Sequence, residues 1–125
     1  MTTRLHFVLA ASFVTFLAGC ATTHEKYSWG GYDHSLYVYY KDPATESALA
    51  HSLEATINTA QNNHAVVAPG IYAEYGYLML QEGNAPAAVS AFRQEEARWP
   101  ESKLFMDHMI AVAQVPTANA STASK

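Results

Sequence analysis

The side chains best suited to chemistry in this 125-residue chain are six histidines, eleven carboxylates and one cysteine, Cys20. No two histidines lie four residues apart, and a zinc site needs three or four convergent ligands. The chain has no G-x-S-x-G turn for a nucleophilic serine, and no glycine pair precedes the Lys-Ser or Lys-Thr of a phosphate loop. We therefore expect no metal, no cofactor and no catalytic site.

Glu95 and Glu96 are the one pair of neighbouring carboxylates. In a glycan hydrolase, two carboxyl groups must face the same glycosidic bond, one as general acid and the other as base or nucleophile. Adjacent residues of a helix point about 100° apart, so these two cannot do so. The pattern predicts a solvated helix face instead.

Cys20 ends the sequence LAGC at residues 17–20, directly after an apolar N-terminal run. Arg4 precedes this run and small residues come just before the cysteine, an arrangement typical of a signal peptide cleaved before Cys20. The apolar run, residues 5–18, is shorter than the roughly 20 residues of a membrane-spanning helix. The alternatives are an uncleaved membrane anchor and an ordinary secretory signal in which the cysteine is incidental.

Residues 17–20 resemble the lipobox of bacterial lipoproteins. The resemblance implies a diacylglycerol on the Cys20 sulfur and an acylated new N-terminus, which together anchor a protein stably to a membrane. Ala21 stands where enterobacterial lipoproteins retained in the inner membrane carry aspartate, so the resemblance implies the periplasmic face of the outer membrane. We expect residues 1–19 to be the signal peptide and residues 20–28 to be a lipidated tether.

Composition after the signal peptide indicates one small domain. The 106 residues from Cys20 onward suffice for a single core, and their net charge is about −5 once Arg4 is removed. There is no basic stripe, so we expect no nucleic-acid partner. With its cysteine lipidated, the chain has no thiol left for a disulfide, and packing alone must hold the fold.

Apolar periodicity predicts an all-α domain of about five helices over residues 29–113, with a disordered tail at 114–125. The expected helices are 32–40, 44–62, 69–81, 85–98 and 101–112. In the second helix, Leu49, Leu53, Ile57 and Ala60 form one apolar stripe that should face the core. In the last helix the residues expected to face inward are Leu104, Phe105, His108, Met109 and Val112.

The third and fourth helices resemble a tetratricopeptide repeat, a helix-turn-helix unit of 34 residues. The matching pattern is aromatic-x₂-Tyr-Gly-x₂-Met, then Ala-x₃-Phe, then Pro, and its residues are Tyr72, Tyr75, Gly76, Met79, Ala88, Phe92 and Pro100. The resemblance implies a short array of antiparallel helix hairpins in which Gly76 and Ala88 permit a close crossing and Phe92 fills it. Residues 29–62 are similar to a degenerate earlier repeat.

Residues 27–43, 68–84 and 98–110 together resemble a family of small Gram-negative lipoproteins, domain of unknown function 4810. This resemblance implies an envelope assembly that includes a lipoprotein similar to the curli secretion channel. It supplies no catalytic residue.

All eight tyrosines and both tryptophans lie between Tyr27 and Trp99. Trp29, Tyr32 and Tyr37, close to the tether, are the residues we expect to bind a protein partner, because Trp and Tyr dominate many interfaces. The alternative is that the tyrosine clusters pack in the core and at its edge. The last helix is a second candidate surface. The expected function is that of a non-catalytic, lipid-anchored adaptor of an envelope complex; the alternatives are a periplasmic binding protein for a glycan or other small ligand, and an enzyme.

Overall fold

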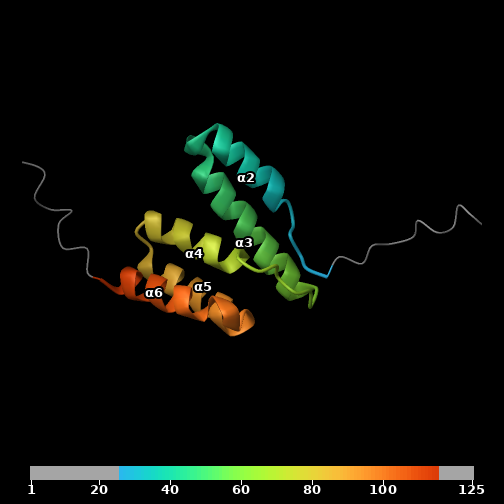
Figure 1. The fold of residues 1–125 in the computed structure, drawn as a ribbon. Helices are drawn as coiled ribbons and strands as arrows, with labels where there is room; N and C mark the ends of the chain where they lie inside the picture. Colours follow the sequence, from blue (N-terminus) through green and yellow to red (C-terminus); the bar gives the residue numbers. More distant parts are fainter. Residues whose placement is uncertain (1–25, 116–125) are drawn as a thin grey trace, which may run out of the picture.

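The computed structural model describes residues 26–115, and these form five α-helices and two 3₁₀ turns packed as adjacent antiparallel pairs (Figure 1). The elements in chain order are α2 (Tyr32–Lys41), η2 (Pro43–Thr45), α3 (Glu46–Asn62), α4 (Ile71–Gln81), α5 (Ala85–Arg98), η3 (Pro100–Ser102) and α6 (Lys103–Gln114). Extended pairing within 26–115 is limited to one isolated bridge between Ser28 and Val67. The expected all-α fold of about five helices is confirmed for this part of the chain.

The first hairpin, α2 and α3, turns at Asp42 and Pro43. The Asp42 carboxylate accepts a hydrogen bond from the Ala44 N–H at 3.1 Å, and Pro43 occupies the first position of η2. Proline is tolerated there because its missing N–H would have no partner at the start of a helix. The sequence predicts one helix from residue 44, whereas the structure has the 3₁₀ turn η2 before α3 begins at Glu46.

The second hairpin, α4 and α5, is closed by Gly83 and Asn84. Gly83 has a φ of 80°, a conformation in which a side chain would be strained. Asn84 then caps α5, because its side-chain oxygen accepts the Ala87 N–H at 3.2 Å. These local signals explain why the predicted range 85–98 matches α5.

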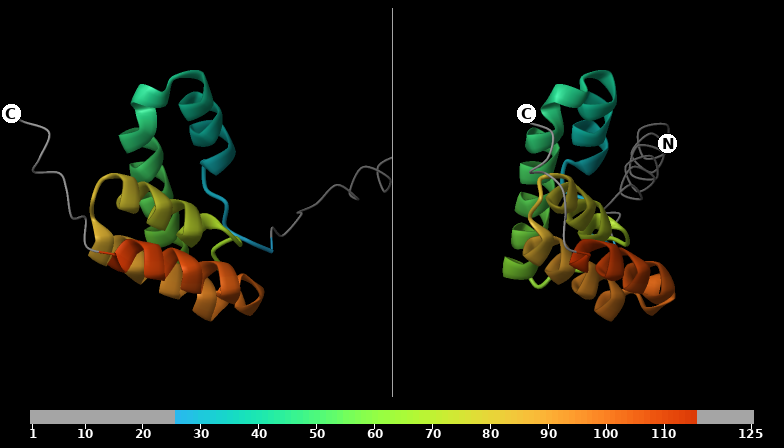
Figure 2. Two further views of the ribbon diagram at one scale, coloured as in Figure 1. Left: turned by 60° about the vertical axis from the view of Figure 1, so that its left-hand side comes forward. Right: turned by 90° about the vertical axis from the view of Figure 1, so that its left-hand side faces the viewer.

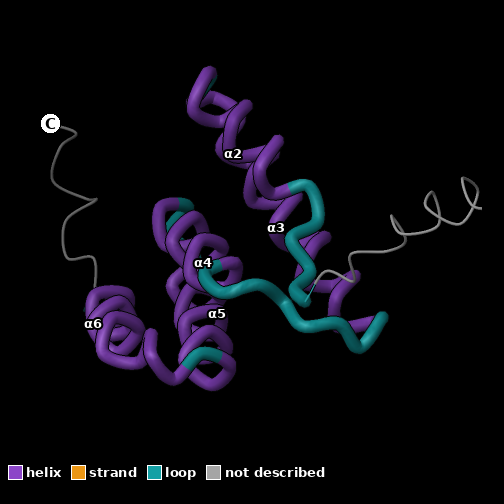
Figure 3. The backbone as a smooth tube through the Cα atoms, turned by 45° about the vertical axis from the view of Figure 1, so that its right-hand side comes forward, coloured by secondary structure: helices purple, strands orange, loops and turns teal. Residues whose placement is uncertain are grey.

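The core lies where α3, α4 and α5 meet, and its largest fully buried side chains include Tyr72, Phe92, Leu49, Leu53 and Ile71. The predicted stripe of α3 is buried as expected. In contrast, α2 has no fully buried residue and packs mainly on α3. The α2–α3 hairpin stands across the layer formed by α4, α5 and α6 (Figures 2 and 3).

Helix α6 is rotated relative to the sequence-based expectation. Met106 and Ala113 are buried and Met109 is half-buried, but Leu104 and Phe105 are 85% and 60% exposed. His108 and Val112 are also exposed. The prediction that these side chains face inward is therefore wrong for every residue except Met109. The physical reason is that α6 packs mainly against α5 and η3, so one narrow stripe is sufficient to cover its neighbour.

No helix in residues 26–115 has both the length and the apolar character needed to cross a membrane. The expected signal peptide at 1–19, the expected lipidation site Cys20 and residues 116–125 of the tail predicted over 114–125 lie outside the described residues, whereas Gln114 is the last residue of α6.

Candidate functional site

An apolar groove of about 320 Å³ lies between α4 and α6. Both helices pack against α5, which contributes Phe92 to the lining. The lining residues are Gly70, Ala73, Glu74, Tyr77, Phe92, Phe105, Met106 and Met109. A concave, mostly apolar surface with few polar groups is the usual form of a binding site.

Gly76 determines how closely the aromatic residue of α5 approaches α4. A Cβ atom at Gly76 would lie 2.7 Å from the Phe92 Cε1 atom and 3.2 Å from the Ala88 carbonyl oxygen. Only a glycine leaves this space, so Phe92 can pack directly beneath α4 and line the groove. The next residue, Tyr77, points away from the core and is 50% exposed.

The rotation of α6 provides the opposite side of the groove. Met106 is buried and Met109 is half-buried, while Phe105 stands at the rim with 60% of its surface exposed. Exposed large apolar side chains that gather around a concavity indicate an interaction surface more strongly than scattered ones. Tyr77 and Phe105 are therefore the residues that a bound molecule would meet first.

Glu74 is the one charged side chain among the groove-lining residues. It is half-buried, and within residues 26–115 it forms no ion pair. Burial, followed by the charge of Glu74, raises the pKa of Tyr32 above that of an exposed tyrosine. Glu74 therefore acts electrostatically on the start of α2 as well as facing the groove.

Two of the three aromatic residues proposed to bind a partner lie together. The rings of Trp29 and Tyr32 stack with centroids 6.3 Å apart; Trp29 is 42% exposed and Tyr32 is half-buried. Tyr37 lies about 140° around α2 from Tyr32 and has the Lys41 ammonium 5.6 Å from its ring centre. Trp29 and Tyr37 thus belong to different faces.

Glu95 corrects an expectation from the sequence, because its side chain is buried rather than solvated and is only 1% exposed. Its Oε1 atom accepts a hydrogen bond from the Gly70 N–H at 2.7 Å, at the N-terminus of α4. A helix N-terminus has free N–H groups, from which a carboxylate can accept hydrogen bonds. It also has a partial positive charge, which attracts the negative charge of a carboxylate. Burial raises the pKa of Glu95, although backbone hydrogen bonds from the α4 terminus oppose the shift.

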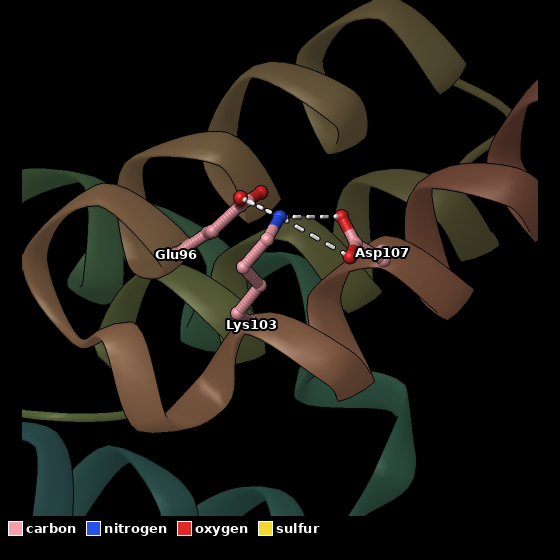
Figure 4. Close-up of polar contacts among 3 residues, drawn as sticks. All are labelled: Glu96, Lys103 and Asp107. Carbon is pink, nitrogen blue, oxygen red and sulfur yellow. Dashed lines mark hydrogen bonds and ion pairs between the residues drawn. The ribbon is translucent and has the colours of Figure 1, made fainter.

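Glu96, in contrast, belongs to a surface ion-pair cluster. The Lys103 ammonium at the start of α6 contacts Glu96 of α5 and also lies 3.2 Å from Asp107 (Figure 4). Hydrogen bonds to Glu96, and then to Asp107, raise the pKa of Lys103. Because the lysine is occupied by two carboxylates, this cluster joins α6 to α5 and offers no free charged group to a ligand.

The residues of the repeat-like pattern all fall at or near the α4–α5 hairpin. Tyr72, Gly76, Met79, Ala88 and Phe92 are buried, Tyr75 is half-buried, and Pro100 is an exposed residue that begins η3. The sequence reasoning did not identify Glu74, Tyr77 and Phe105 as members of one site. The available signals were the tyrosine cluster at 72–77 and the apolar residues on more than one side of the last helix.

Within residues 26–115 no three histidine, cysteine, aspartate or glutamate side chains come together as metal ligands would. A family model described as a domain of unknown function, DUF4810, matches residues 26–109. No curated protein matches the chain significantly, and neither does any solved structure.

Proposed function

The chain belongs to the DUF4810 family, whose description assigns no activity, and we propose that it is a non-catalytic adaptor, anchored by lipid at the periplasmic face of the outer membrane, that binds another protein. One observation carries this proposal: the groove between α4 and α6 exposes Tyr77 and Phe105 at its rim. Aromatic anchors around an apolar pocket are characteristic of protein interfaces.

The polar groups of the groove favour a protein over a glycan. Among the lining side chains, polar atoms are contributed by the Glu74 carboxylate and the Tyr77 hydroxyl. A sugar presents many hydroxyl groups, each of which needs a hydrogen-bond partner when it is buried. A site with so few donors and acceptors is better suited to apolar side chains, and the glycan-binding alternative becomes an outcome of the test below.

The proposed anchor places the domain close to the membrane. From Cys20 to Trp29 the chain can extend about 30 Å at most, so a lipid on Cys20 keeps the Trp29–Tyr32 stack near other anchored proteins. Confinement to one surface raises the local concentration of a neighbour, which favours even a modest interface. A lipoprotein similar to the curli secretion channel is the partner that we propose.

We also propose that the fold is a short tetratricopeptide-like array. The support is the spacing of the seven pattern residues, together with the close approach of Gly76 to Phe92 at the α4–α5 crossing. In such arrays each hairpin depends on its neighbours to cover its apolar faces. Helix α6 fits the role of a cap because it covers α5 with one stripe.

The adaptor function is tested by purifying the tagged full-length protein from detergent-solubilised envelopes. We expect one protein partner to be recovered in a fixed stoichiometric ratio. Recovery of the chain without any stoichiometric protein, but with bound saccharide detected by mass spectrometry, would favour the small-ligand alternative and contradict the adaptor.

Single substitutions then separate the two aromatic faces. Trp29→Ala removes the exposed ring that stacks on Tyr32, whereas Tyr37→Ala acts on the other face of α2. If the Trp29 face contributes to the interface, Trp29→Ala reduces partner recovery more than Tyr37→Ala does, with both variants keeping the wild-type circular-dichroism spectrum. Unfolding of Trp29→Ala would show instead that the ring serves the core.

A further inference from the structure

We infer that the groove between α4 and α6 takes an apolar segment of the partner protein that carries a lysine or arginine, and that the Glu74 carboxylate pairs with this cation. The inference rests on the proposed adaptor function and specifies the chemistry of its partner. It depends on the shape of the groove, on the environment of Glu74 and on the charge of the chain.

The shape of the groove suits a few side chains rather than a whole domain. Its volume of about 320 Å³ is at the lower end of ligand sites. Phe92, Met106 and Met109 present apolar atoms inside it, and methionine side chains adapt to ligands of different shape. An apolar side chain of the partner can therefore insert between Tyr77 and Phe105 and displace water from their exposed rings.

Such insertion would also remove water from Glu74, which is already half-buried. A carboxylate that loses its water without gaining a counter-charge is strongly destabilised. No lysine, arginine or histidine within residues 26–115 pairs with Glu74, so the compensating charge has to come from the occupant. The neighbouring Tyr32 hydroxyl can donate a hydrogen bond to the Glu74 carboxylate, but a tyrosine side chain carries no positive charge and so cannot be the counter-charge.

The overall charge favours the same kind of partner. The chain has a formal net charge of −4, and the nearest lysine on α6, Lys103, is already shared by Glu96 and Asp107. A negative surface attracts a cationic segment during encounter and disfavours an acidic one. An apolar segment with one or more basic residues is therefore complementary to both the lining and the field of this face.

The first experiment identifies what occupies the groove. The photo-cross-linking amino acid p-benzoylphenylalanine replaces Tyr77 or Phe105 in the full-length protein, which is irradiated in detergent-solubilised envelopes. Tyr40, a 76% exposed tyrosine of α2 to which no role in binding is assigned, receives the same substitution as a control. We expect Tyr77 and Phe105 to cross-link to one peptide of the stoichiometric partner, and mass spectrometry should show apolar residues and a lysine or arginine in it.

The second experiment tests the charge of Glu74. Glu74→Lys should reduce the yield of the groove cross-link about tenfold or more, because a charge-assisted contact becomes a repulsion. Glu82→Lys, the same charge change at an exposed position at the end of α4, should leave the yield within about twofold. Glu74→Gln removes the charge with little change of shape, and it tests the inference even if Glu74→Lys does not fold.

The third experiment exchanges the two charges of the proposed pair between Glu74 and the basic residue of the partner. Changing the lysine or arginine of the cross-linked peptide to glutamate should abolish the cross-link to wild-type protein and restore it to Glu74→Lys. A groove-bound peptide without a cation, or equal yields from Glu74→Gln and wild type, would overturn the inference. A stoichiometric partner that cross-links only at Tyr40 would overturn it too while leaving the adaptor function intact, whereas the absence of any stoichiometric partner would contradict the adaptor itself.

Discussion

At the scale of single residues, Gly76 and Glu95 hold the two sides of the α4–α5 hairpin together by different means. Gly76 permits contact by having no side chain, with the Phe92 ring in the space that a Cβ would occupy. Glu95 of α5 has a long side chain whose Oε1 atom accepts a hydrogen bond from the Gly70 N–H at the N-terminus of α4. Neither residue lies at the groove surface, yet both position the helix that carries Glu74 and Tyr77.

Gly76→Ala should lower the free energy of unfolding by about 1–3 kcal/mol, because the new Cβ overlaps a buried ring. The better helix propensity of alanine, up to about 1 kcal/mol, offsets part of this cost. Denaturant melts of the domain measure the change. Phe92→Leu makes room for the methyl group, so the two substitutions together should cost less than the sum of the singles. If the changes in the free energy of unfolding of the two single variants simply add in the double variant, the two residues do not contact each other.

Glu95→Gln should remove a pH dependence of stability. Burial raises the native pKa of Glu95, so the native state holds the proton more tightly than the unfolded chain does. The contribution of Glu95 protonation to the free energy of unfolding is therefore fully present below the pKa of an unfolded glutamate, about 4.3. This contribution is lost as the pH rises through the native pKa of Glu95. Melts at a series of pH values should show this loss in the wild type and in the exposed control Glu82→Gln, but not in Glu95→Gln.

At the scale of elements, α6 determines the shape of the candidate site. It uses one stripe, including Met106 and Ala113, to cover α5, and it leaves Phe105 at the rim of the groove. Its first residue, Lys103, is tied to Glu96 of α5, which opposes rotation of α6 about its own axis. One helix thus both covers α5 and places Phe105 at the candidate site.

Alanine substitutions of two neighbouring residues of α6 should therefore have different effects, one on stability and the other on partner recovery. Met106→Ala should lower the free energy of unfolding by about 2–5 kcal/mol, as is usual when a buried side chain is truncated. Phe105→Ala should change stability by no more than about 0.5 kcal/mol and should instead reduce partner recovery. Thermal melts and co-purification of the two variants make the comparison; equal destabilisation by both would contradict the observed orientation of α6.

At the scale of the whole molecule, the proposed function depends on the proposed connection between the domain and the membrane. The described domain begins at residue 26, six residues after the expected lipidation site. Lipid attachment would hold both the groove and the Trp29 face near other membrane-anchored proteins. In this proposal, the groove between α4 and α6 would determine which partner protein binds. The lipid anchor would keep the domain at the membrane surface, where it can meet that partner.

Cys20→Ser should abolish acylation and either release the protein from the membrane fraction or leave it as an unprocessed precursor. The physical reason is that the acyl chains would supply the apolar burial that anchors the processed protein, at about 0.8 kcal/mol for each buried CH₂ group. Detergent-phase partitioning and an intact-mass measurement follow both outcomes. A cleaved Cys20→Ser chain that remained fully in the membrane fraction would contradict the lipoprotein assignment.

The number and approximate ends of the helices can be predicted from the sequence, because they depend on local chemistry. Asp42-Pro43, Gly83 and Asn84 act within a few residues of where they stand, and the regular apolar stripe of α3 faces the core as its spacing predicts. These features need no knowledge of distant parts of the chain. The same holds for the absence of recognisable catalytic motifs, which is a property of residue types and spacing.

The buried face of α6 and the direction of the Glu95 side chain depend instead on how the helices pack together. Helix α6 has apolar residues on more than one side, so its orientation depends on the shape of α5. The role of Glu95 depends on the Gly70 amide, 25 residues away in the chain. The groove depends on this packing, because Glu74 and Tyr77 come from α4 and Phe105 comes from α6, and both helices pack against α5. Local sequence cannot encode such a site, since packing between distant segments creates it.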